Sequence, residues 1–250
     1  MNMTQNTILI TGGSNGIGLA LAERFLAGGN RVIICGRRED KLREAEKRHH
    51  GLTTRVCDVA VESERLALSA WLAKEFPDLN ILINNAGIQN IINVRTADRE
   101  WAHFQQEIAI NLEAPVHLSL LLARRLAGKP GAAIINVSSG LAFMPMAASP
   151  LYSATKAAVR SFTMSLRRQL AASGVDVVEI IPPMVQTDLC APGVHNSGVP
   201  VEEFADAVLR GLADGRQEIA YGHTISLLNM SRSELEAATD TLNARIPLPA

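Results

Sequence analysis

The sequence predicts an α/β fold, in which a doubly wound parallel sheet is covered by helices on both faces. Short apolar runs rich in β-branched residues alternate with longer amphipathic stretches along most of the chain. Strands that are apolar throughout are typical of a parallel sheet buried on both sides, and the stretches between them supply the crossover helices. With 250 residues, 47% of them hydrophobic, and no evident linker, we expect a single domain over residues 1–250.

The individual elements follow from this alternation in chain order. Strands are predicted at residues 7–10, 31–35, 54–56, 81–83, 133–137, 175–181 and 218–221. Helices are predicted at 17–27, in a charged stretch ending at 47, near 62–76, 98–127 and 151–172, and at 201–213 and 231–244. The last helix is expected to start with a capping box that pairs Ser231 or Ser233 with Glu234 or Glu236. Residues 182–200 hold four prolines and two glycines and predict a long functional loop.

Composition excludes several classes of protein. The formal net charge is −1 and the two signs are interspersed, which indicates neither a basic surface for nucleic acid nor a polybasic membrane patch. The three cysteines have no CxxC spacing, no secretory signal begins the chain, and no apolar run could span a bilayer. We therefore expect a reduced, cytoplasmic protein. His103, His117, His195 and His223 lack metal-ligand spacing, so no metal site is expected.

A glycine-rich loop lies between the first predicted strand and the first predicted helix. Glycine permits a tight turn and a close approach of backbone to a pyrophosphate, and the free N–H groups of a helix N-terminus attract the anion. This strand–loop–helix context predicts a Rossmann-like dinucleotide site. The residues expected to cradle the phosphates are Gly12, Ser14, Asn15, Gly16, Ile17 and Gly18.

A tyrosine and a lysine one helical turn apart, Tyr152 and Lys156, are the strongest candidates for chemistry. Ser149 and Pro150 predict the start of their helix, with a capping side chain followed by proline at the first helical position. An ammonium beside a phenol is expected to lower the pKa of the phenol, which would make a proton donor. Alone, such a pair is also common on solvated helix faces.

Taken together, these motifs and four others resemble the short-chain dehydrogenase/reductase family over roughly residues 6–190. The further motifs are Asp58-Val59, Asn84-Asn85-Ala86-Gly87, Asn111 within Ala109-Ile110-Asn111-Leu112, and Val137-Ser138-Ser139. The run Ser138–Phe143 and the sequence after residue 181 also resemble a narrower bacterial subgroup, similar to the oxidoreductase encoded beside teichoic-acid D-alanylation genes.

The resemblance implies four catalytic residues. Tyr152 is expected to exchange a proton with the substrate oxygen, and Ser139 to hold that oxygen. Lys156 is expected to lower the pKa of Tyr152 and hold the nicotinamide ribose, and Asn111 to bridge Lys156 to solvent. The resemblance also implies cofactor contacts at Asp58, Val59, Asn85, Ala86, Gly87, Tyr152, Lys156, Pro182, Val185 and Thr187. The implied reaction is hydride transfer between a nicotinamide cofactor and a carbonyl or alcohol.

The end of the second predicted strand bears on the choice of cofactor. NAD-specific members of the family usually carry an acid where Gly36 stands, and an acid there would repel a 2′-phosphate. Here Arg37 and Arg38 follow instead, and guanidinium groups suit a phosphate. We therefore expect NADP(H), with Arg37 the main contact. The alternative is that both arginines merely begin a solvated helix and the enzyme is an NADH-dependent alcohol dehydrogenase.

The predicted substrate pocket is mostly apolar. By position in the family it should be lined by Ile88, Gln89, Ser139, Leu141, Phe143, Met144, Met184, Val185 and Leu189. This lining favours an apolar or aromatic carbonyl compound, with the loop after residue 183 closing over it. Pro183 stands where many members have glycine, and it removes an N–H near the nicotinamide position.

The family resemblance also implies a homodimer or homotetramer, built on the long helices at 98–127 and 151–172. Two other activities compete with a carbonyl reductase. An enoyl reductase is disfavoured by the Tyr-x-x-x-Lys spacing with Ser139 13 residues upstream of Tyr152, since those relatives space the tyrosine–lysine pair more widely. A nucleotide-binding sensor without turnover would commonly lack the tyrosine or the lysine, and here all four catalytic positions are filled.

Overall fold

The computed structural model describes residues 2–191, 193–246 and 248, and it confirms the predicted α/β fold. One parallel sheet has the strand order β3-β2-β1-β4-β5-β6-β7. Its strands are β1 (Thr7–Thr11), β2 (Arg31–Gly36), β3 (Thr53–Val56), β4 (Ile81–Asn84), β5 (Ala133–Val137), β6 (Asp176–Ile181) and β7 (Glu218–Ala220). Every predicted strand is present. Strands β1, β2, β4, β5 and β6 are largely buried between the helices, whereas β3, at the edge of the sheet, is half-buried to exposed.

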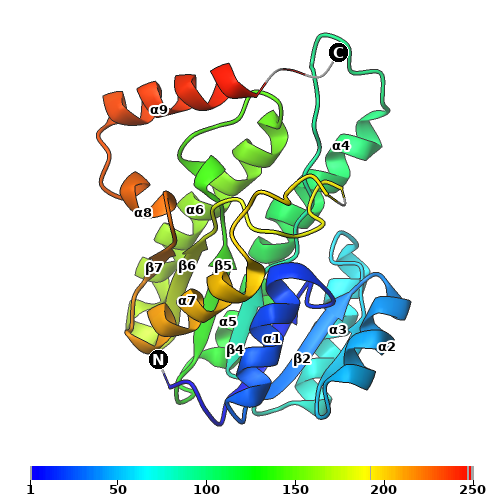
Figure 1. Cartoon of the computed structure of the whole chain (residues 1–250). Coiled ribbons are helices and arrows are strands. Elements are labelled where there is room, and N and C mark those ends of the chain that lie inside the picture. The colour runs from blue at the N-terminus through cyan, green and yellow to red at the C-terminus, as the bar shows by residue number, and fades with distance from the viewer. Residues whose placement is uncertain (1, 192, 247, 249–250) are drawn as a thin grey trace.

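Helices cover both faces of this sheet (Figure 1). One face is packed by α1 (Gly16–Ala27), α2 (Glu39–Arg48) and α7 (Val201–Ala213), and the other by α3 (Glu62–Glu75), α5 (Ala114–Leu126) and α6 (Pro150–Leu170). Successive strand residues point to opposite faces, so Ile8 and Ile10 join the first core while Leu9 joins the second. The apolar residues of the central strands therefore pack on both faces of the sheet, and Asn84, Asn136 and Glu179 are buried polar exceptions.

The helix predicted at residues 98–127 is interrupted. It consists of α4 (Trp101–Ile108), a turn of π-helix η1 (Ala109–Glu113) and α5. The wide turn holds Asn111, and π-turns inside helices frequently mark functional positions. Hydrophobic periodicity gave no sign of this turn, because one extra residue in a turn barely changes the apolar pattern.

The C-terminal ends of the strands carry the irregular segments (Figure 1). These are η2 (Gly140–Ala142), the loop 182–200, α8 (Thr224–Leu227) and α9 (Arg232–Arg245), while η3 (Ala171–Ser173) ends α6 at the other side. As predicted, the loop contains no strand or helix among its described residues, apart from a bridge between Val185 and Val199; Pro192 lies outside the described residues. Ser231 and Glu234 form the capping box of α9, which selects one pair among the predicted alternatives.

The chain reverses its direction of travel across the sheet between β1 and β4, and clefts for ligands form at such switch points. Thr11 ends β1 beside this switch point. Its hydroxyl accepts hydrogen bonds from the backbone N–H groups of Asn85 and Ala86, both at 3.0 Å. The ends of β1 and β4 are thus held together beside the glycine-rich loop. In the part of the chain that the structure describes, no helix is long and apolar enough to cross a membrane.

A buried ion pair ties α6 to the strands behind it. Arg160 donates to the fully buried carboxylate of Glu179 at 2.6 Å and to Glu218 at 2.7 Å, and its guanidinium lies 4.1 Å from the Phe143 ring centroid. Ser138 donates to the same Glu179 carboxylate at 2.6 Å. Burial raises the pKa of Glu179, while Ser138 and Arg160 lower it.

Replacing Arg160 with methionine should therefore lower the free energy of unfolding by about 3 kcal/mol, because it leaves a buried carboxylate without its cation. Urea unfolding of Arg160→Met measures the loss. The control is Arg168→Met, an exposed arginine that donates only to Met164 of its own helix, where a change within about 0.5 kcal/mol is expected. Equal stability of the two variants would show that the Glu179 carboxylate does not need Arg160.

Candidate active site

The glycine-rich loop adopts the shape that a phosphate cradle needs. Gly12 and Gly16 have φ of +65° and +55°, a conformation open mainly to glycine. Asn15 stands at the N-cap of α1 without capping it by its side chain, so the first N–H groups of the helix stay available. A Cβ on Gly18 would lie 2.5 Å from both Asn85 Nδ2 and the Gly12 carbonyl oxygen. Gly18 therefore serves the packing of α1 against the loop rather than lining the cleft.

Tyr152 and Lys156 lie one turn apart on α6, and both are buried. The ammonium of Lys156 donates to the Val137 carbonyl at the end of β5, at 2.8 Å, and lies 5.6 Å from the Tyr152 ring centroid. Ser139 lies two residues after that strand end, and its hydroxyl accepts from the Leu141 N–H at 3.1 Å. The end of β5 and the first turns of α6 thus bring the three predicted catalytic side chains to one wall.

The predicted lowering of the Tyr152 pKa is wrong. Burial raises the pKa of Tyr152 to about 12, against a lowering effect from Ser139 and a further raising effect from Glu107. Burial also lowers the pKa of Lys156 to about 8, with Glu107 acting in the opposite direction. Both groups lose water on folding, and desolvation favours the neutral form of each. Burial is thus the largest influence on both pKa values.

The shifted lysine predicts a pH dependence of stability. The pKa of Lys156 is about 8 in the folded protein and has its ordinary value of 10.5 in the unfolded chain, so the unfolded chain binds more protons between these pH values. The free energy of unfolding should therefore rise with pH across that window, relative to Lys156→Met. Urea unfolding of both proteins from pH 7 to 10 measures the difference. Lys47→Met, on the exposed side of α2, is the control, and parallel profiles for wild type and Lys156→Met would contradict the prediction.

Asn111 acts on the neighbouring loop rather than on the cavity itself. From the π-turn, its side-chain oxygen accepts from the Ile88 N–H at 2.9 Å, and its amide donates to the Ile88 carbonyl at 2.8 Å and to Thr155 at 3.2 Å. Asn111 thereby joins the end of β4 to the helix that carries Tyr152 and Lys156. Its predicted bridge from Lys156 to solvent stays a prediction.

Ser149 is the N-cap residue of α6, and Pro150 occupies the first turn as predicted. The predicted capping by its side chain is wrong. The Ser149 hydroxyl instead donates to the Asn90 carbonyl at 2.9 Å and accepts from Gln89 at 3.1 Å. Full burial beside residues 89–90 offers the hydroxyl these partners in place of the helix N–H groups.

One cavity of about 780 Å³ joins the phosphate loop to Tyr152 and Lys156. Most of the predicted site residues line it: Gly12, Ser14, Asn15, Gly16, Ile17, Arg37, Arg38, Asp58, Val59, Asn85, Ala86, Gly87, Ile88, Gln89, Ser139, Leu141, Met144, Tyr152, Lys156, Pro182, Met184, Val185, Thr187 and Leu189. Gly18, Asn111 and Phe143 do not. Phe143 instead packs its ring against the guanidinium of Arg160.

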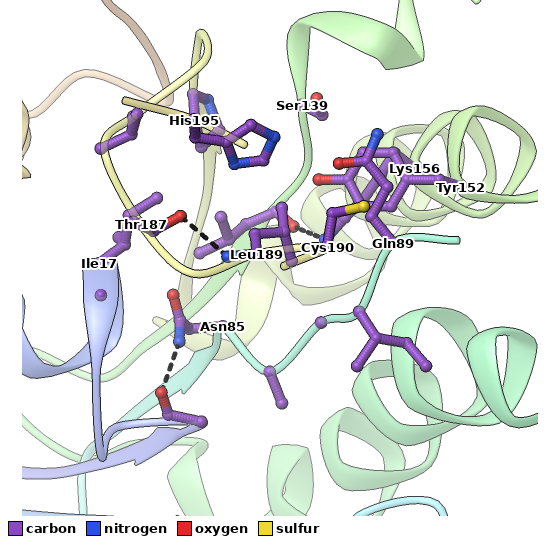
Figure 2. Close-up of a pocket in the computed structure, with 18 of the residues that line it drawn as sticks. Ile17, Asn85, Gln89, Ser139, Tyr152, Lys156, Thr187, Leu189, Cys190 and His195 are labelled. Atoms are coloured by element: carbon purple, nitrogen blue, oxygen red, sulfur yellow. Dashed lines mark hydrogen bonds between the residues drawn. The ribbon is translucent and has the colours of Figure 1, made fainter. Parts of the chain in front are cut away.

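Several lining residues escaped prediction because they come from segments without a motif. Asn90 belongs to the segment after β4, His103 and Gln106 lie on α4, and Cys190 and His195 belong to the loop 182–200. Figure 2 shows His195, Thr187 and Leu189 arriving on this loop, with Gln89, Tyr152 and Lys156 grouped on the other side of the pocket. Leu242 and Ile246 reach the cavity from the C-terminal region. Asn243 anchors that region by donating to Pro145 O at 3.0 Å and accepting from Ala147 N at 2.6 Å.

Comparison with known proteins agrees with this arrangement. The model of the short chain dehydrogenase family matches residues 6–197. The chain is 46% identical over 250 residues to the uncharacterized oxidoreductase DltE of Bacillus subtilis (strain 168), covering 98% of this chain and 99% of that protein. This similarity confirms the family resemblance and the narrower one.

Two solved structures share the fold over nearly their whole length. A short-chain dehydrogenase from Sphingobium yanoikuyae in complex with NADPH is 26% identical with a TM-score of 0.79, covering 98% of each chain. A short-chain dehydrogenase from Burkholderia cenocepacia J2315 in complex with NADP is 26% identical with a TM-score of 0.82, covering 100% of each. With its motifs gathered around one cavity and its sequence matched over most of its length, this chain belongs to the short-chain dehydrogenase family.

Proposed function

We propose that this oxidoreductase transfers hydride between NADP(H) and a carbonyl or alcohol substrate, with Tyr152 as its acid and base. The observation that carries the proposal is that Ser139, Tyr152 and Lys156 line the same cavity as the phosphate loop. A nucleotide held at the loop and a carbonyl held at the tyrosine would therefore occupy one continuous space.

The cleft residues fit a nicotinamide dinucleotide. The left-handed glycines Gly12 and Gly16, with the uncapped N-terminus of α1, offer backbone N–H groups to a pyrophosphate. Asp58 and Val59 line the cavity after β3, where the adenine would bind, and Val185 and Thr187 line it beyond β6, near the nicotinamide. Pro183 also lines the cavity, so its ring occupies part of the wall where many relatives have glycine.

The reaction needs a proton donor that is held in place. The bound reduced nicotinamide would supply the hydride to the carbonyl carbon. The Ser139 hydroxyl would donate a hydrogen bond to the carbonyl oxygen and stabilise the charge that grows there. Tyr152, whose pKa is about 12, holds its proton at neutral pH and would donate it to the same oxygen. Lys156 would bind the nicotinamide ribose. Asn111 is a positioning residue, because it joins the segment after β4 to the helix that carries Tyr152 and Lys156.

The preference for NADP(H) rests on the end of β2. Gly36, Arg37 and Arg38 all line the cavity, and neither guanidinium forms an ion pair with another described residue. An unpaired guanidinium at this position suits a 2′-phosphate. The two structural relatives, whose complexes contain NADPH and NADP, support the same choice.

Removing this guanidinium should weaken NADPH selectively. In Arg37→Ala we expect the KM for NADPH to rise about tenfold, the loss of one charged hydrogen bond, while the KM for NADH stays unchanged. Gly36→Asp should lower kcat/KM for NADPH further, because its carboxylate would repel the phosphate. Arg43→Ala, which removes a guanidinium paired with Glu39 on the same helix, is the control. Equal use of NADH and NADPH by wild type, unaffected by Arg37→Ala, would refute the NADP(H) assignment.

The proposal is tested by NADPH oxidation against a panel of ketones, aldehydes, quinones and enoyl compounds. Turnover of ketones or aldehydes would support the carbonyl reductase, and turnover of the enoyl compounds alone would identify an enoyl reductase. The second candidate, a nucleotide-binding sensor, would show tight NADPH binding by calorimetry without any turnover. In that case the interaction with its partner should survive Tyr152→Phe.

A further inference from the structure

Two neighbouring amide side chains, Gln89 and Asn90, form a polar section of the cavity wall that the proposed function leaves unused. Both line the main cavity, and both also line a smaller adjoining one of about 310 Å³. They follow β4 and meet the first turn of α6, the turn that carries Tyr152. Gln89 is buried, yet it is not part of either core cluster.

Hydrogen-bond accounting orients the Gln89 amide. The Asn90 backbone carbonyl can only accept, so the Ser149 hydroxyl must donate its single proton to that oxygen, at 2.9 Å. The Ser149 oxygen must then be the acceptor in its contact with Gln89, at 3.1 Å, and Gln89 must donate through Nε2. The carbonyl oxygen of Gln89, Oε1, is thereby turned away from Ser149.

The Asn90 amide is oriented in the same way by Glu107 on α4. This carboxylate is fully buried and accepts from Asn90 twice, from the backbone N–H at 3.3 Å and from Nδ2 at 2.9 Å. Burial raises the pKa of Glu107, while both Asn90 contacts lower it, so the ionised form is the one that these donors stabilise. With Nδ2 committed to Glu107, the Asn90 side chain also has its carbonyl oxygen left over.

Both leftover oxygens retain access to solvent. Neither oxygen accepts a hydrogen bond from the residues that the structure describes. If either were fully buried, it would be a buried polar atom without a partner, and among the described residues that holds only for Asn84 Oδ1. Gln89 Oε1 and Asn90 Oδ1 are therefore reached by solvent, and both residues line the main cavity and the smaller one beside it. The wall next to Tyr152 thus offers two acceptors to a substrate; Figure 2 shows Gln89 beside Tyr152 and Lys156.

We propose that Gln89 and Asn90 select carbonyl substrates that carry a hydroxyl group close to the reacting carbonyl, an inference that rests on the proposed function. A hydroxyl donates to an amide oxygen, whereas a ketone without one leaves that oxygen desolvated and unpaired. The rest of the substrate would contact Ile88, Leu141 and Met144, which line the same space. The substrate class is therefore an α-hydroxy ketone or aldehyde with an apolar body, which narrows the apolar compound expected from the sequence.

Three matched ketones test the inference: 2-hydroxy-1-phenylethanone, its methyl ether and 1-phenylpropan-1-one. The ether keeps the oxygen and loses only the donor hydrogen, and the third compound loses both. We expect kcat/KM for the hydroxy ketone to exceed that for either analogue by about tenfold or more, because only the hydroxy ketone can donate the additional hydrogen bond. Gln89→Met should abolish the preference, so that kcat/KM no longer distinguishes the hydroxy ketone from its two analogues. The control is Gln105→Met, which replaces an exposed glutamine on α4 and should retain the preference for the hydroxy ketone.

Calorimetric titration of the same ketones into NADP⁺-saturated protein separates this inference from the proposed function. Turnover and binding that do not distinguish the three ketones would overturn the inference and leave the reductase standing. Hydroxyl-dependent binding that disappears in Gln89→Met would support it, even if none of the three ketones is reduced. Absence of both turnover and hydroxyl-dependent binding would also overturn it. The comparison among ketones uses wild-type protein, so it holds even if Gln89→Met fails to fold.

Discussion

Tyr152→Phe should reduce kcat for carbonyl reduction by about 10³-fold, within the range typical for loss of a general acid. The phenol is buried in the cavity wall, and its raised pKa keeps the proton on the oxygen until a carbonyl oxygen receives it. Phenylalanine retains the ring and its packing and removes only the hydroxyl. The affinity for NADPH and the thermal midpoint should therefore change little. Steady-state NADPH oxidation and calorimetric NADPH binding measure the two effects separately.

The second tyrosine of the chain provides a matched control. Tyr221 packs on Phe204 with ring centroids 6.1 Å apart, and its hydroxyl bonds Glu203 at the exposed surface. Tyr221→Phe should leave kcat unchanged. Full turnover in Tyr152→Phe would remove this residue from the chemistry and with it the proposed mechanism.

Gly18→Ala should weaken NADPH binding by about 10- to 100-fold and lower the thermal midpoint, although Gly18 does not line the cavity. Its added Cβ would lie 2.5 Å from Asn85 Nδ2 and from the Gly12 carbonyl oxygen, and 3.0 Å from Gly13 Cα. Two of these neighbours are backbone, so the phosphate loop itself must shift. Overpacking of this kind costs about 1–3 kcal/mol, and the shift displaces the N–H groups that bind the pyrophosphate.

Gly36→Ala is the control for this effect, because it adds the same methyl group at another glycine of the site. There the new Cβ would meet Ser14 Oγ at 3.5 Å, an ordinary contact. We expect nearly unchanged stability and an NADPH dissociation constant within a fewfold of wild type, both by calorimetry. An equal loss in the two variants would show that added volume, and not displacement of the loop, is responsible.

Motifs that depend on local geometry were predictable from the sequence. Gly12 and Gly16 stand where the backbone turns left-handed, and Tyr152 and Lys156 are one turn apart because they share a helix. Parallel strands with helical crossovers bring every strand's C-terminal end to one edge. The ends of β1, β4 and β5 could therefore be expected to meet, and the residues that follow them do line one cavity.

Features that depend on neighbours distant in sequence were not predictable. Ser149 stands at a helix start, and local rules assign its hydroxyl to capping, yet Gln89 and Asn90 take it. Similarly, Gly18 matches the family's phosphate motif in sequence, but the structure gives it a packing role against Asn85. In both cases a partner from another part of the chain outweighs the local preference.

By itself the sequence determined the order of strands and helices, the family, and the positions of the phosphate loop and the Tyr152–Lys156 pair, because these follow from periodicity and short-range spacing. Only the tertiary structure decided the ionisation of that pair and the orientation of the amides on the cavity wall. Burial raises the pKa of Tyr152 and lowers that of Lys156. Desolvation and hydrogen-bond partnership are properties of the surrounding packed chain, and a residue's own neighbours in sequence do not specify them.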